Sequence, residues 1–137
     1  MSASTHIRVL RAGGALLILL GIVHLAATPH ISRLIRHSAS AEAANQLIPP
    51  MLLNHVLVGV LLLPLGFLML YAAPHSAARV AWAQVVVRTT ALSVAVLPVA
   101  LFALMGTRYY FAAPLFVLGA ALTVIVAVTL LVVAFAR

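Results

Sequence analysis

The sequence predicts an all-α integral membrane protein whose four helices cross the bilayer in an up-down-up-down bundle. Two observations lead to this fold class. Of the 137 residues, 66% are apolar and 7% are charged, whereas about a quarter of the residues of a soluble domain are charged. The apolar residues also fall into long runs, and a helix of about 20 residues crosses the hydrocarbon of a bilayer. A chain of this length suits one domain, so we expect a single transmembrane domain over residues 1–137.

The chain contains four apolar segments that are long enough to be transmembrane helices. They cover approximately residues 12–28, 51–71, 81–105 and 111–136. Pro29 is expected to end or kink the first helix. We expect this first span to be retained and not cleaved as a signal peptide, because the residues near Ala27 match a cleavage site poorly. The second span is expected to begin after Pro50, since proline is tolerated at the start of a helix.

Residues 29–50 are expected to form the only long connection between spans. Within them, Ile31, Leu34 and Ile35 share one helical face, and the basic residues lie elsewhere around the turn. This pattern predicts a short amphipathic segment in the headgroup layer, and residues 39–46 also favour a helix. The other connections are short, which implies that consecutive helices run antiparallel.

The distribution of arginine predicts the orientation of the chain, because arginine is enriched in cytoplasmic loops. With the amino terminus inside, the inner side holds Arg8, Arg11, Arg79, Arg88 and Arg137, and the outer side holds Arg33, Arg36 and Arg108. We therefore expect both termini in the cytoplasm and the protein in a bacterial cytoplasmic membrane.

The composition excludes several classes of function. The chain has no cysteine, which excludes disulfides and thiol chemistry. Its single acidic residue, Glu42, lies in the first predicted connection, so no hydrolytic triad or carboxylate proton relay is expected. The arginines are scattered between apolar runs, so we expect no nucleic-acid partner. The sequence predicts no independent enzymatic activity.

Two of the six histidines, His24 and His55, lie inside predicted spans. Each is four residues from the outer end of its span, which corresponds to about 6 Å at the helical rise. Because the two spans are consecutive and antiparallel, we expect the two imidazoles at nearly the same depth beneath the outer membrane face.

The residues near these histidines point to a bound cofactor. Gly21 and Gly59 each lie about one turn from a histidine on the same face, which would leave clearance for a flat haem b held between the two imidazoles. Further candidate ligands on the outer side are His30, Met51 and Met105. Histidine and methionine without cysteine or carboxylate suit copper or haem iron.

A packing role explains the same residues without a ligand. Neutral histidines hydrogen-bond across membrane helices, and small residues let helix backbones approach. The heptad recurrence of glycine on the first two spans, at positions 14, 21, 59 and 66, is what close packing requires. Methionine is also a common filler of irregular gaps. Both interpretations stay open at this point.

Arg88 is a second polar residue inside a predicted span, and Gln84 precedes it by one turn on the same face. The arginine side chain is expected to snorkel to the inner headgroups. Alternatively, Arg88 and Gln84 bind an anion or lipid at the inner face, such as a quinone headgroup. Because Arg88 lies near the opposite face from the two histidines, one compact site using all three is not expected.

Three functions fit these observations. The first is an accessory subunit of a larger membrane assembly or a homo-oligomer. The second is a binding protein that holds haem b or a copper-type metal between the first two spans near the extracytoplasmic face. The third is a carrier or binder of an apolar molecule such as a quinone or lipid, with the histidines only packing. The lipid bilayer is the immediate partner in each.

Overall fold

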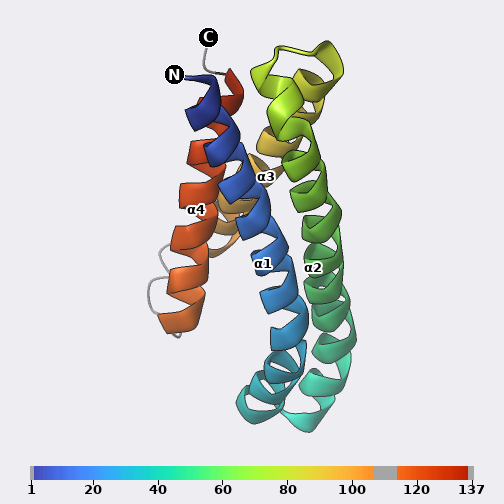
Figure 1. The fold of residues 1–137 in the computed structure, drawn as a ribbon. Coiled ribbons are helices and arrows are strands. Elements are labelled where there is room, and N and C mark those ends of the chain that lie inside the picture. The colour runs from blue at the N-terminus through green and yellow to red at the C-terminus, as the bar shows by residue number, and fades with distance from the viewer. Residues whose placement is uncertain (1, 107–113, 136–137) are drawn as a thin grey trace. The chain divides into compact units, whose positions relative to one another are not determined.

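The computed structural model describes residues 2–106 and 114–135. These residues form four helices, α1 (Ala3–Ser38), α2 (Ala41–Ala77), α3 (Ala81–Met105) and α4 (Pro114–Phe135) (Figure 1). Each helix contains a segment long and apolar enough to cross a membrane. The predicted all-α fold with four spans is confirmed, and the protein is a small integral membrane protein.

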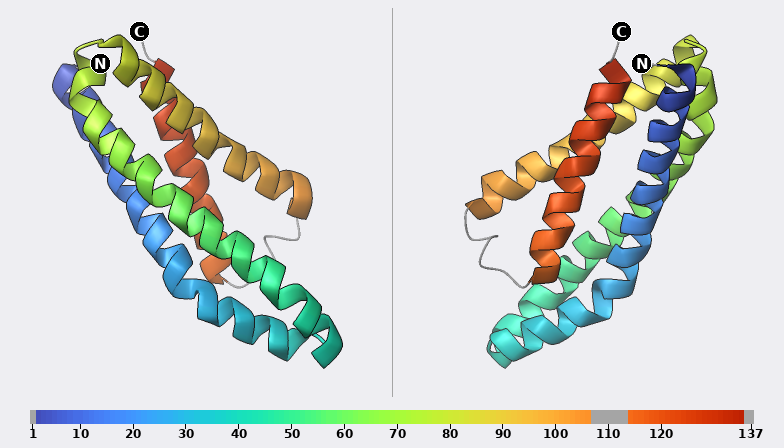
Figure 2. Two further views of the ribbon diagram at one scale, coloured as in Figure 1. Left: turned by 90° about the vertical axis from the view of Figure 1, so that its right-hand side faces the viewer. Right: turned by 60° about the vertical axis from the view of Figure 1, so that its left-hand side comes forward.

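The first connection is much shorter than the sequence predicted. α1 continues through Pro29 to its end at Ser38, and α2 begins at Ala41, so the predicted loop over residues 29–50 does not form. A proline removes one amide donor, whereas ending a helix within lipid would expose several backbone groups. The prediction that residues 39–46 favour a helix is correct for residues 41–46, which form the first turns of α2. Figure 2 shows α1 changing direction toward its carboxyl end, in keeping with a kink at the interior proline.

The predicted third span coincides with α3. The fourth span was predicted from residue 111, and α4 begins at Pro114; residues 111–113 and 136 lie outside the described part of the chain.

Local side-chain bonds explain the tight turn between α1 and α2. His37 Nδ1 donates to the carbonyl of Arg33 at 2.9 Å in the last turn of α1. The amide of Ala43 donates to Ser40 Oγ at 3.3 Å, so Ser40 caps α2. Glu42 lies in the first turn of α2, where a negative charge interacts favourably with the helix dipole.

The turn between α2 and α3 is a Schellman motif. The amide of Val80 donates to the carbonyl of His75 at 2.9 Å, and the amide of Arg79 donates to the carbonyl of Ser76 at 2.9 Å. Arg79 has a φ of 59°, the left-handed conformation that this motif requires at the residue after the cap. The motif satisfies carbonyls that the end of α2 leaves without helical partners.

The described chain divides into two compact units, one of residues 2–14 and 68–135 and the other of residues 15–67. In the first unit, α3 buries a stripe at helical spacing, formed by Ala83, Val87, Thr90, Ala91 and Val94. Met69 of α2 and Leu130 of α4 are also fully buried. Gly13 of α1 packs against α4, since a Cβ there would lie 2.6 Å from Leu130 Cδ2.

In the second unit, α1 and α2 run side by side in opposite directions (Figures 1 and 2). They approach most closely at Gly21 and Gly59. A Cβ on Gly21 would lie 2.8 Å from the carbonyl oxygen of Gly59, and a Cβ on Gly59 would lie 3.1 Å from that of Gly21. Only residues without a side chain permit this backbone contact.

Many large apolar side chains are exposed on the helices. Leu61 is 61% exposed, Val85 63% and Val132 64%. A water-soluble protein rarely exposes contiguous apolar surface on this scale. These surfaces are suited to contact with the lipid bilayer, the one partner that the helices themselves establish.

Candidate metal-binding site

The imidazole rings of His24 and His55 lie side by side in the second unit. Their centroids are 4.7 Å apart, and their planes are inclined by 40°. Both side chains are half-buried between α1 and α2. The prediction that the two rings lie at the same level on antiparallel helices is confirmed; the sequence left open whether they face each other.

The local hydrogen bonds of His24 fix its tautomer. Its Nδ1 lies 3.1 Å from the carbonyl oxygen of Leu20, and because a carbonyl only accepts, Nδ1 must carry the hydrogen. The other ring nitrogen, Nε2, then holds the lone pair of the neutral imidazole. A backbone carbonyl that orients the ring in this way is the usual companion of a metal-binding histidine.

His55 has a polar atom without a partner. Its Nδ1 is buried, and no hydrogen-bond partner lies within reach among the described residues. Nearly all buried polar atoms in folded proteins are paired, so an exception calls for an explanation. A nitrogen that is kept available for a ligand is one such explanation.

The continuous helices change the expected depth of the histidine pair in the bilayer. No charged residue occurs between Arg11 and Arg33, and at 1.5 Å per residue this segment of α1 is about 32 Å long, which matches the hydrocarbon thickness. His24 then lies about 14 Å from the level of Arg33 and about 20 Å from that of Arg11. The depth of about 6 Å predicted from the sequence assumed that the helix ends at Pro29, whereas α1 continues to Ser38; both depths stay predictions.

Spin labelling at Ala26 measures this depth. Ala26 is exposed on α1, and the chain has no cysteine, so a label on Ala26→Cys is unique. We expect the label about 10 Å below the level of Arg33, more accessible to oxygen than to a polar nickel chelate. Ser40→Cys supplies the aqueous reference. A label only about 3 Å below the surface would support the shorter first span that the sequence predicted.

The space beside Gly21 and Gly59 is filled by the neighbouring helix. The space next to Gly21 holds the carbonyl oxygen of Gly59 and, at 3.0 Å from a Cβ position, the Cδ2 of Leu63. This is the arrangement that close helix packing requires. A haem between the two imidazoles would require α1 and α2 to separate at this point.

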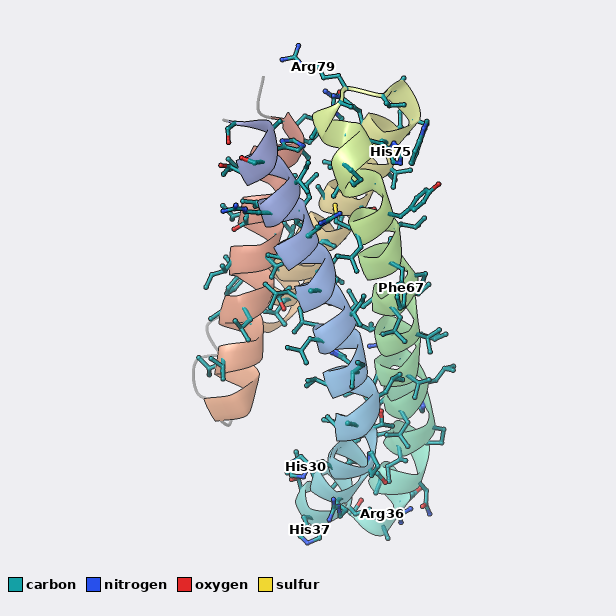
Figure 3. The ribbon with its side chains drawn as sticks, in the orientation of Figure 1. His30, Arg36, His37, Phe67, His75 and Arg79 are labelled. Atoms are coloured by element: carbon teal, nitrogen blue, oxygen red, sulfur yellow. The ribbon has the colours of Figure 1, made fainter. Side chains whose placement is uncertain are left out.

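The other predicted ligands differ in their positions. Met51 precedes His55 by one turn on α2, and its side chain is 51% exposed. His30 is exposed and, like His37, projects outward near the end of α1, so it is not brought to the pair (Figure 3). The side chain of Met105 lies outside the described part of the structure.

The site offers few metal-ligating side chains. Within residues 2–106 and 114–135, no group of three or more histidine, cysteine, aspartate or glutamate side chains could hold a metal ion. Structural zinc sites use four such ligands and catalytic ones three. Two neutral imidazoles with a nearby thioether suit a softer ion that accepts few protein ligands.

No protein-family model matches the chain, and no curated protein or solved structure matches it either. The function is therefore inferred from the residues of the site.

Arg88 has a structural role that the sequence did not indicate. Its Nε donates to the carbonyl of Ala134 at 3.3 Å, and its guanidinium lies 5.5 Å from the ring centroid of Phe135. A positive charge near the end of α4 also interacts favourably with the helix dipole. Gln84 is half-buried one turn earlier. Binding of an anion or lipid by Arg88 and Gln84 stays a prediction.

Three further contacts of the first unit were missed. His6 Nε2 and Ser76 Oγ lie 3.2 Å apart, which ties the start of α1 to the end of α2. The rings of Tyr71 and Trp82 stack at 5.6 Å, and His75 lies 5.1 Å from Trp82. Tyr71 and His75 share a helical face, but the contact with Trp82 depends on the turn between α2 and α3.

Proposed function

We propose that this membrane protein binds a single transition-metal ion of the copper type between His24 and His55. The observation that carries the proposal is the contact between the two rings, at 4.7 Å between centroids, with Nδ1 of His55 buried and unpartnered. Ionisable residues within membrane helices usually mark functional sites. The hydrogen bond from His24 to Leu20 supports the same role, because it leaves one ring nitrogen ready to coordinate.

A single ion fits this site better than haem. A macrocycle would have to enter where the backbones of Gly21 and Gly59 are already in contact. An ion needs only the two ring nitrogens as ligands. The glycines then serve the ion indirectly, because they hold α1 and α2 close enough for both imidazoles to reach it.

The proposal includes a setting in the cell. Both termini lie in the cytoplasm, which the arginines at positions 8, 11, 79 and 88 support. The protein acts as an accessory subunit or binding protein in a larger membrane assembly. Its small size and its exposed apolar helix surfaces favour such a role.

Metal analysis of substituted proteins tests the proposal. The protein is purified in detergent from copper-supplemented cells, and its metal content is measured by mass spectrometry. We expect about one copper ion per chain in the wild type, and at least a tenfold loss of bound copper in His24→Gln and His55→Gln, since each change removes one of two imidazole ligands.

His30→Gln is the matched control, because His30 lies on the same helix as His24 and is exposed. It should retain copper at the wild-type level. A visible absorption band of haem in the wild type that is lost in His24→Gln would show that the bound group is haem and not a single ion. A metal-free wild-type protein that copurifies with quinone or lipid would overturn the proposal in favour of an apolar ligand.

A further inference from the structure

We infer that the ion is monovalent copper and that Met51 supplies a third, sulfur ligand. This inference rests on the proposed function, since it names the ion and completes the ligand set at the same histidine pair. Three properties of the site lead to it: its charge, its geometry and the position of Met51.

The surroundings of the pair supply no negative charge. The single acidic residue, Glu42, lies about 20 Å before His55 along α2, and a neutral imidazole adds no charge. The ion therefore keeps its full charge inside the hydrocarbon. The cost of transferring an ion into a low dielectric rises with the square of its charge, so a divalent ion costs about four times as much as a monovalent ion of similar size. This difference favours Cu(I) over Zn(II) and Cu(II).

The spacing of the rings leaves one side of the ion open. An ion at a normal distance of about 2.0 Å from a ring nitrogen lies about 3 Å from the centroid of that ring. Two centroids 4.7 Å apart can then share one ion only in a bent arrangement. At this ring spacing, the nitrogen–ion–nitrogen angle would be about 100°, which would leave room for a third ligand.

Met51 is in position to be that ligand. It lies one turn before His55 on the same face of α2, and side chains of a helix tilt toward its amino terminus. This general tilt would place the ring of His55 over the turn that carries Met51. The methionine side chain is 51% exposed and has three rotatable bonds, so packing does not prevent it from swinging to the ion. Thioether sulfur selects Cu(I) over harder divalent ions.

Paired metal titrations test the inference. The detergent-purified protein is titrated without oxygen with Cu(I) against bicinchoninate, and separately with Zn(II) against a zinc-sensitive fluorescent chelator. We expect Cu(I) to bind at least about a hundredfold more tightly than Zn(II). Met51→Leu should weaken Cu(I) binding about tenfold and leave Zn(II) binding unchanged. X-ray absorption of the copper-loaded protein should show a Cu–S shell that Met51→Leu loses.

Met69→Leu is the matched control, because it makes the same change on the same helix at a buried position. It should keep both the affinity for Cu(I) and the Cu–S shell. Equal affinities for Cu(I) and Zn(II), both lost in His24→Gln, would overturn the inference and leave the proposed function standing. A Cu–S shell that persists in Met51→Leu would overturn the role of Met51. No binding of either ion would overturn the inference and the proposed function together.

Discussion

Replacing Gly21 with alanine is expected to destabilise the protein by about 1–3 kcal/mol, the usual effect of overpacking. The added Cβ would lie 2.8 Å from the carbonyl oxygen of Gly59, and a backbone atom cannot rotate away as a side chain can. Alanine also has the higher helix propensity, by about 1 kcal/mol, but this gain is smaller than the cost of separating the helices. Unfolding by sodium dodecyl sulfate in mixed micelles, followed by circular dichroism, measures the difference.

Two other glycines supply matched controls. Among the described residues, no atom apart from its own neighbours on the helix lies within 4 Å of the Cβ position of Gly119 in α4, so Gly119→Ala should be neutral or stabilising by up to about 1 kcal/mol. The effect of Gly13→Ala on stability should lie between those of Gly21→Ala and Gly119→Ala, because its Cβ would meet the flexible end of Leu130 at 2.6 Å. If Gly21→Ala is as stable as Gly119→Ala, α1 and α2 do not pack through a glycine contact.

The fold class followed from composition and hydropathy because lipid imposes a simple rule. Every backbone polar group inside the hydrocarbon must be paired, so each long apolar run forms a helix. The ends of the helices were harder to predict. Pro29 usually ends a helix in water, but α1 continues past it to Ser38. The free-energy cost of the one backbone hydrogen bond that proline cannot donate depends on whether water or lipid surrounds the helix, and the local sequence does not show which.

The candidate site was predictable in part. The equal height of His24 and His55 follows from counting residues along two antiparallel helices, and the structure confirms it. The use of Gly21 and Gly59 was left open, because clearance for a cofactor and close helix contact require the same residue type. The partner of Arg88 was not predictable, since the Ala134 carbonyl is 46 residues away in the chain. Contacts between distant segments are set by packing geometry and leave no local pattern.

Replacing His55 with leucine is expected to stabilise the metal-free protein and to abolish its stabilisation by Cu(I). Nδ1 of His55 is buried without a partner, and an unsatisfied buried polar atom costs about 1–3 kcal/mol. Leucine is similar in volume and has no polar atom to satisfy. Wild-type protein should gain about 2.7 kcal/mol when free Cu(I) is a hundredfold above its dissociation constant. The variant should gain nothing, and unfolding in mixed micelles with and without Cu(I) measures both changes.

The response to Cu(I) separates the two roles of this histidine. If the ring of His55 only packs, Cu(I) should stabilise neither protein, whatever leucine at position 55 does to the stability of the metal-free protein. If the ring is kept as a ligand, the metal-free variant should be the more stable of the two, and saturating Cu(I) should remove or reverse that order. His30→Leu makes the same change at an exposed position of α1 and should follow the wild type in both conditions. Loss of a packing histidine should change the stability by the same amount with and without the ion, whereas loss of a ligand should also abolish the stabilisation by the ion.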